Sequence, residues 1–369
     1  MNEDRAARYQ RLKRRVSVVS VIWSAALLAA LLAGGSHRSL RDVAERLVPA
    51  APVLAYVLLL SLLNEIGSLP LALYSGLVLE RRYGLSTERL SGWALDQAKS
   101  FGIGLALAGG AASLVYGFIA KSPEWWWLGA GVAFALIIVV LTNLAPVVLL
   151  PIFYTVKPLD QEQLRARLLG LAERAGARVL GAYEWGLSEK TRKANAALAG
   201  LGATRRILVS DTMLADYSED EIEVVLAHEL AHHVHGDIWK GIAFESALVI
   251  GGFYAASRAL SASVALFGLR GVDDVAGMPI LLLSAGAVSL AVVPLAHAMS
   301  RAFERSADAY ALKLTRNPSA FVSAMRRLGA QNLAEENPSK LVEWLFYSHP
   351  PIRARIEAAQ AFTPLRELP

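Results

Sequence analysis

Long apolar runs dominate the pattern of hydrophobic and polar positions along this chain. Six of these runs have about the length, roughly 20 residues, that an α-helix needs to cross about 30 Å of hydrocarbon. They predict six transmembrane helices, with the alternative that one run is re-entrant or merely buried. The runs cover residues 16–33, 53–79, 101–120, 125–150, 241–268 and 279–299.

Mixed, charged sequence replaces this pattern between the fourth and fifth runs. Helical spacing over 160–175 predicts a helix. Ser218 followed by Glu221 forms a capping box, so a further helix is expected to begin just before His228. Strands are predicted over 179–185, 194–199 and 206–210. This part of the chain is therefore expected to be a small inserted α+β domain.

The predicted fold class is mainly α, a polytopic helical membrane protein with an inserted α+β domain. Four parts follow from the changes in pattern: a membrane region with four transmembrane helices, a cytoplasmic-side α+β domain, two more transmembrane helices and a C-terminal helical part. Their expected bounds are 1–150, 151–240, 241–303 and 304–369.

Composition supports a membrane protein, because 54% of the 369 residues are hydrophobic and 19% are charged. Six basic residues between Arg5 and Arg15 precede the first run, which is expected to be a retained anchor because no small-residue cleavage site follows it. Basic residues beside spans tend to stay in the cytoplasm, which places the α+β domain and the C-terminal part there. The basic segment 36–49 falls on the outer side and is expected to lie flat as an amphipathic helix.

The net charge of +5 is explained by this topology, and no motif for nucleic-acid binding accompanies it. The absence of cysteine excludes disulfides, thiolate metal ligands and a cysteine protease. The expected location is a bacterial inner membrane, or the endoplasmic reticulum in a eukaryote, with lipid as a partner. Neither composition nor pattern predicts an oligomeric state.

The stretch HELAHHVHGD carries the candidate chemistry. Positions one helical turn apart share a face, so His228 and His232 can bind a single Zn²⁺ ion. Glu229 between them completes an HExxH pattern, in which the glutamate takes a proton from the water on the zinc. His233 points away from this face, and a pair formed by His232 and His235 is the alternative ligand set.

Catalytic zinc generally has three protein ligands and one open position, so a third ligand is expected elsewhere. Glu304 directly follows the sixth apolar run, at its expected cytoplasmic end. The HExxH helix leads into the fifth apolar run at the same expected side of the membrane. Asp308, one turn after Glu304, can accept the N–H of a ligating histidine and fix its tautomer. Its alternative role is a surface ion pair.

Several ordered motifs resemble the type I CAAX prenyl proteases, which are integral-membrane zinc metalloproteases. Besides HELAH and the ExxxD of Glu304 and Asp308, the motifs are LPLALYSGLVLERRYGLS, DQAK, PIFYTVKPL, KANAALAG, ILVSDTML and YSHPPIRAR, which together span residues 69–355. The resemblance implies transmembrane helices around a chamber that a zincin-like domain closes. The family has seven spans, whereas six are predicted here.

The resemblance also implies roles for residues outside the HExxH helix. His349 and Arg355 resemble a pair that holds substrate and stabilises the oxyanion. Asn195, Ala196 and Ala197 resemble the edge strand that binds an extended peptide. The family has aromatic residues after the first two of these positions, whereas this chain has Ala197, Leu198 and Ala199.

The predicted function is that of a zinc metalloendopeptidase acting on peptide or protein substrates, including lipidated CAAX-like ones, with Glu229 as general base and one zinc ion per chain. An alternative within proteolysis is membrane-protein quality control, as in heat-shock-induced membrane metalloproteases. A metal transporter is a further alternative, but its ligands are expected near the middle of the spans. An inactive scaffold would not require Glu229.

Overall fold

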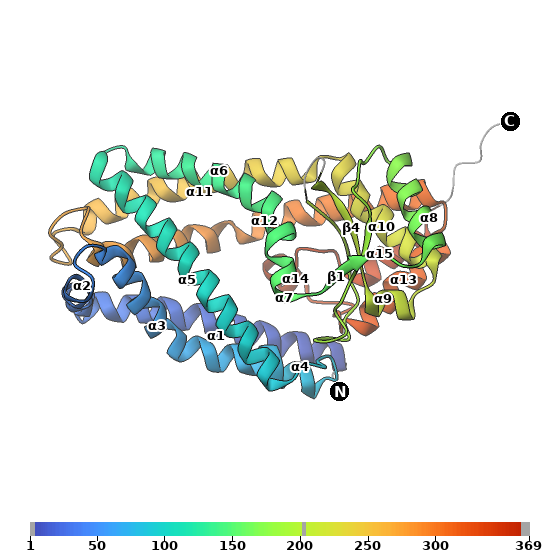
Figure 1. Cartoon of the computed structure of the whole chain (residues 1–369), viewed down its shortest axis with the longest axis horizontal. Helices are drawn as coiled ribbons and strands as arrows, with labels where there is room; N and C mark the ends of the chain where they lie inside the picture. The colour runs from blue at the N-terminus through green and yellow to red at the C-terminus, as the bar shows by residue number, and fades with distance from the viewer. Residues whose placement is uncertain (1–3, 201–203, 363–369) are drawn as a thin grey trace.

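The computed structural model describes residues 4–200 and 204–362. Long helices lie along the long axis of the molecule, and a small sheet with shorter helices lies at one end (Figure 1). The N-terminus lies at the same end as the sheet (Figure 1). The molecule thus has a helical part and a mixed part arranged end to end.

Four helices in the described residues are long and apolar enough to cross a membrane: Arg5–Ala33, Pro52–Arg82, Leu90–Lys121 and Val275–Thr315. The first is α1 and the third is α5. The second joins α3 (Pro52–Leu73), a π-helical turn (Tyr74–Val78) and α4 (Leu79–Arg82). The fourth joins a short 3₁₀ turn (Val275–Gly277) to α12 (Met278–Thr315).

The other two predicted spans lie in α6 (Trp126–Val148) and α11 (Asp237–Ser263). The described apolar part of α6 covers Trp126–Thr142, which is shorter than a usual span. Helix α11 is long enough, but Glu245 and Arg258 interrupt its apolar run. It packs along both α6 and α12. Each of the six predicted apolar runs thus lies largely within a helix.

The segment predicted as a flat surface helix is helical, as α2 (Ser36–Leu47), at the far end from the sheet (Figure 1). Its buried face carries His37, Arg41 and Ala44, so polar side chains point into the protein. Arg41 donates to Asp274, just before α12, at 2.7 Å. Helix α2 therefore packs this face onto the ends of the long helices, while Val43 and Leu47 on its other side are 42% and 62% exposed.

The sheet is mixed and has the order β1-β2-β4-β3. Strand β4 pairs in parallel with β2, while the β1–β2 and β3–β4 pairs are antiparallel. The strands are β1 (Val156–Pro158), β2 (Ala182–Trp185), β3 (Ala196–Ala199) and β4 (Arg206–Ser210). The three predicted strands are confirmed, two of them starting later than expected. Strand β3 lies at one edge of the sheet, and within residues 4–200 and 204–362 no further strand pairs with its outer side.

Helices cover one face of the sheet with a single apolar core. They include α8 (Glu162–Arg174), α9 (Asp211–Asp216) and α10 (Glu219–Val234), and the predicted capping box of Ser218 and Glu221 starts α10. The C-terminal helices α13 (Pro318–Gln331), α14 (Lys340–Phe346) and α15 (Ile352–Gln360) complete this end. Leu168, Val209, Leu226 and Phe321 share the core. The α+β insertion and the C-terminal part therefore form one packed body.

Candidate metal centre

Helices α10 and α12 bring three metal-binding groups to one point. His228 and His232 lie one turn apart on α10, and Glu304 faces them from α12. The Nε2 atom of His228 lies 3.1 Å from Oε2 of Glu304, and Nε2 of His232 lies 3.4 Å from Oε1. One ligand atom from each residue lies within 4.8 Å of the others. The fold therefore joins groups that are more than 70 residues apart in sequence.

The environment of these groups fits a bound cation. The Glu304 side chain is only 7% exposed, and its buried Oε2 atom makes no hydrogen bond of acceptable geometry within the described residues. A buried carboxylate oxygen left without a donor is costly unless an ion compensates it. Two imidazole nitrogens and one carboxylate are also a donor set that catalytic zinc uses, with a fourth position open.

Each candidate histidine ligand is held by a buried carboxylate. Nδ1 of His228 lies 2.9 Å from Oδ1 of Asp308, and Nδ1 of His232 lies 3.1 Å from Oδ2 of Asp237. Both rings consequently present Nε2 to Glu304. The sequence suggested Asp308 but not Asp237. Helical spacing could not find Asp237, because α10 ends before Gly236, whose φ of 67° turns the chain.

Arg355 of α15 lies behind the ligands. Its guanidinium donates to both oxygens of Asp308, at 2.9 and 2.6 Å, and its Nη2 lies 3.4 Å from Nδ1 of His228. The side chain is 9% exposed. In this arrangement Arg355 holds the carboxylate that orients His228, whereas the sequence analysis predicted contact with the oxyanion. That earlier role stays a prediction.

Two further predicted residues lie on the open side of the centre. Half-buried Glu229 lines the adjoining cavity, and burial raises the pKa of its carboxyl above the usual range. His349 places Nε2 at 3.3 Å from Oε1 of Glu304, and 60% of its side chain is exposed. A raised pKa suits a carboxylate that has to take a proton and return it, and an exposed imidazole is accessible to a substrate.

The remaining histidines of the HELAHHVHGD stretch lie outside the centre. His233 contacts Nη1 of Arg205 at 3.2 Å. His235 lies against Ser306 and Tyr310 of α12. Within the described part of the chain, the metal-binding cluster contains His228, His232 and Glu304. The geometry thus favours the first ligand set over a pair formed by His232 and His235.

A cavity joins the candidate metal centre to the edge of the sheet. Asn195 and Ala196 of the β3 segment line it, whereas Ala197 is not among its lining residues. Its polar lining residues also include His228, Glu229, Asn332, Glu335, Tyr347, His349 and Arg355. Its larger apolar lining residues are Met213, Val225, Met325, Leu328 and Ile352. The cavity therefore offers an apolar pocket and a strand edge next to the ligands.

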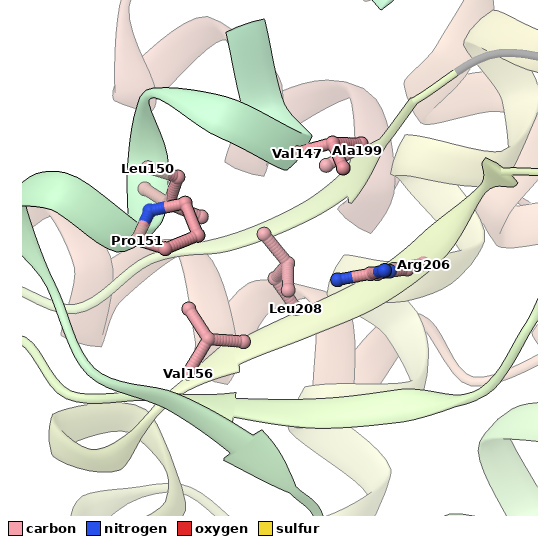
Figure 2. A pocket seen from close by; sticks show the side chains of 7 residues that line it. All are labelled: Val147, Leu150, Pro151, Val156, Ala199, Arg206 and Leu208. Carbon is pink, nitrogen blue, oxygen red and sulfur yellow. The ribbon is translucent and has the colours of Figure 1, made fainter. Parts of the chain in front are cut away.

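A second, small pocket lies where the end of α6 and the short helix α7 (Leu150–Phe153) meet the sheet (Figure 2). Figure 2 shows Arg206 extending toward Leu208 among apolar side chains. The other lining residues are Val147, Leu150, Pro151, Val156 and Ala199. This pocket is a contact zone between the membrane helices and the sheet and holds none of the candidate ligands.

Comparisons with known proteins extend over nearly the whole chain. Residues 158–363 match the family described as peptidase family M48. Residues 2–155 match the family described as CAAX prenyl protease N-terminal, five membrane helices. The two matches meet close to the predicted boundary between the membrane region and the inserted domain.

Individual relatives agree with these matches. The metalloprotease YhfN of Bacillus subtilis is 31% identical over 96% of this chain and 84% of its own length. CAAX prenyl protease 1 of Saccharomyces cerevisiae is 28% identical over 84% of this chain and 72% of its own length. The crystal structure of S. mikatae Ste24p has a TM-score of 0.86 at 24% identity, covering 96% of this chain and 88% of that one. This likeness confirms the predicted fold class of a mainly helical membrane protein with a small sheet.

Proposed function

Because the chain belongs to peptidase family M48 and is thus a membrane metalloprotease, we propose that it hydrolyses peptide bonds with one Zn²⁺ ion held by His228, His232 and Glu304. The observation that carries this proposal is the convergence of three donors, two of them imidazoles oriented by buried carboxylates. Such outer carboxylates fix the tautomer of a ligand and strengthen metal binding.

The mechanism assigns a distinct task to each group around the ion. Bound zinc would supply a Lewis acid that acidifies water and polarises the scissile carbonyl. Glu229 takes the proton of the attacking water and delivers it to the leaving amine. The side chain of His349 is exposed, and its Nε2 atom lies 3.3 Å from Oε1 of Glu304. In this mechanism His349 donates a hydrogen bond to the developing oxyanion. Arg355 keeps Asp308, and through it His228, in place.

Substrate is proposed to bind as an extended strand along the edge of β3. Strand edges bind peptides through backbone hydrogen bonds, while neighbouring pockets select side chains. Asn195 and Ala196 line the cavity beside Glu229, so a peptide paired there has its backbone next to the catalytic groups. The apolar side of the cavity favours an apolar substrate side chain close to the cleaved bond.

The proposed substrate class is peptide or protein chains ending in CAAX-like sequences, with or without a prenyl group. The support is similarity to CAAX prenyl protease 1 of Saccharomyces cerevisiae and the match of residues 2–155 to a CAAX prenyl protease region. Comparing peptides cleaved in cells that carry active enzyme or the Glu229→Gln variant distinguishes this class from general membrane-protein quality control. Cleavage confined to C-terminal motifs supports it, whereas scattered internal cleavage contradicts it.

The catalytic end is proposed to face the cytoplasm. The start of α1, which is basic, and helix α10, which carries His228 and His232, lie at the same end of the molecule (Figure 1). Nη1 of Arg14 in α1 donates to Oε2 of Glu335, a cavity-lining residue, at 2.6 Å. This contact holds the basic end of α1 next to the cavity. Because basic residues next to spans tend to remain in the cytoplasm, both features belong on that side.

The Glu229→Gln variant tests the mechanism. Glutamine keeps the size of the side chain but cannot accept the proton, so peptide cleavage is expected to fall by at least about a hundredfold. Zinc content and thermal stability are expected to stay near those of the wild type, because Glu229 is not a ligand. A fluorogenic peptide assay on purified enzyme measures the change.

Glu219→Gln is the matched control, since Glu219 is an exposed residue in the first turn of the same helix. It should retain wild-type cleavage. Full activity in the Glu229→Gln variant would refute the role of Glu229 as base. Transport of metal without any cleavage would instead favour a transporter.

A further inference from the structure

The segment that leads into β3 is held by hydrogen bonds from α9 and α13. The carbonyl oxygen of Arg192 accepts from Nε2 of Gln331 at 2.9 Å, and that of Lys193 accepts from Oγ1 of Thr212 at 2.8 Å. Ala194 follows and is only 2% exposed. The chain therefore enters the proposed substrate-binding edge in one defined position.

Asn332 makes a two-point contact with the backbone of Ala194. Its Oδ1 accepts from the Ala194 N–H at 3.1 Å, and its Nδ2 donates to the Ala194 carbonyl oxygen at 3.1 Å. This is the pattern of donor and acceptor that a neighbouring strand would offer to one residue. A side-chain amide thus stands where a paired peptide would otherwise continue.

The alternation of backbone directions shows which positions remain available to a peptide. Asn195 bonds toward β4, since its N–H donates to Oγ of Ser210 and its carbonyl oxygen accepts from the Ser210 N–H. Successive residues of a strand point their backbone groups to opposite sides. Ala194, Ala196 and Leu198 therefore point toward the outer edge, and Asn332 already occupies the first of these.

The loop that begins with Asn332 is held from the membrane part of the protein. Leu333 has a φ of 49°, a left-handed conformation that leucine rarely adopts. Its side chain packs against a cluster that includes Tyr9 and Leu79, and its carbonyl oxygen accepts from Nε2 of Gln10 at 2.8 Å. Contacts with α1 and α4 thus hold Asn332 against the strand.

We propose that Asn332 is a positioning residue that closes the outer edge of β3 at Ala194 and so sets where a bound peptide can begin to pair. This inference rests on the proposed peptidase function. It predicts that a peptide pairs with Ala196 and Leu198 and has to end or turn away next to Asn332. Asn332 itself takes no part in proton transfer.

The test separates substrate binding from turnover. Asn332→Asp keeps the shape of the side chain but places an oxygen where Nδ2 donated to the Ala194 carbonyl oxygen. Because the two oxygens repel each other, the backbone at Ala194 is expected to shift. We expect KM for a cleaved peptide to rise by about tenfold, with kcat changed by less than about twofold. Asn332→Ala, which removes both contacts, should raise KM to a similar extent. Peptide affinity in the Glu229→Gln background, measured by fluorescence anisotropy, should weaken by the same factor.

Asn317→Ala is the matched control, because Asn317 caps the other end of α13 through a bond to the Ala320 N–H. It should lower the melting temperature without changing KM. Wild-type KM and peptide affinity in both Asn332 variants would overturn the inference, as would parallel losses of kcat, zinc and stability without a specific effect on KM. A wild-type enzyme that neither binds nor cleaves peptides would overturn the proposed function and this inference with it.

Discussion

Both candidate histidine ligands depend on a carboxylate partner, yet the two partners come from different places. Asp308 lies on α12 and is itself held by Arg355, whereas Asp237 is the first residue of α11 and is 7% exposed. The Asp237 carboxylate also receives a bond from Lys240 at 3.0 Å. His232 is thus oriented by the first residue of the helix that follows the metal-binding helix along the chain.

Asp237→Asn should weaken zinc binding, because the neutral amide polarises the His232 ring less and no longer enforces its tautomer. Loss of such an outer partner typically costs about 10- to 100-fold in metal affinity. Competition with a chromophoric chelator measures the dissociation constant directly. Lys240→Ala, which removes the exposed ion pair on the same carboxylate and a cation–π contact with Phe303, should leave the constant unchanged. Equal zinc affinity in Asp237→Asn and the wild type would contradict the assignment.

At the scale of elements, the long apolar helix α1 also supports two residues that line the cavity. Nη1 of Arg14 donates to Oε2 of Glu335 at 2.6 Å and to the Tyr347 hydroxyl at 2.8 Å. The same hydroxyl donates to Glu335 at 2.8 Å, and both residues line the cavity. The position of α1 is therefore coupled to the shape of the proposed substrate site.

Arg14→Gln should loosen this wall, since the Glu335 carboxylate loses its charged donor. The pair is partly exposed, at 18% and 15%, so the expected effect is a rise in KM of about three- to tenfold, with only a small loss of stability. Steady-state kinetics with a soluble peptide provides the measurement. The exposed neighbour Arg15, changed to Gln, controls for the loss of one positive charge. An unchanged KM in Arg14→Gln would show that the contact is dispensable.

The sequence predicted those helices and strands that have a recognisable pattern within their own residues. The capping box at Ser218 and the apolar run that became β4 have their own sequence signatures, and both lie where they were expected. Strand β1 was missed because its three residues, which include Lys157 and Pro158, show no alternation and form a strand only by pairing with β2. Asn332 was missed for a similar reason, since its partner Ala194 is 138 residues away.

The whole molecule has separate polar clusters at its two ends. One is the metal centre, and the other joins α2 to the turn before α12, where the side chains of Arg41 and Asp274 are 10% and 1% exposed. Tyr116 of α5 also donates to the Asp274 carbonyl oxygen at 3.4 Å. The long helices between these clusters expose many apolar side chains, as expected for surfaces in contact with lipid.

Arg41→Met should destabilise the far end without affecting catalysis. Removing one partner of a buried ion pair leaves an uncompensated charge, which typically costs about 3–5 kcal/mol. We expect the melting temperature in detergent to fall by at least about 5 °C. Zinc content and peptide cleavage well below that temperature should remain at wild-type levels. Arg46→Met, on the exposed side of the same helix, should have little effect on either property. A parallel loss of zinc would show that the two ends are coupled.

The single core shared by the inserted domain and the C-terminal helices has a consequence for biosynthesis. The histidines of α10 are synthesised before α11 and α12, whereas Glu304 lies in the second half of α12 and is made only after α11 and the first half of α12. A nascent or wrongly inserted chain therefore carries an incomplete ligand set. The order of synthesis thus sets how much of the chain has to be made before a metal ion can be held by all three candidate ligands.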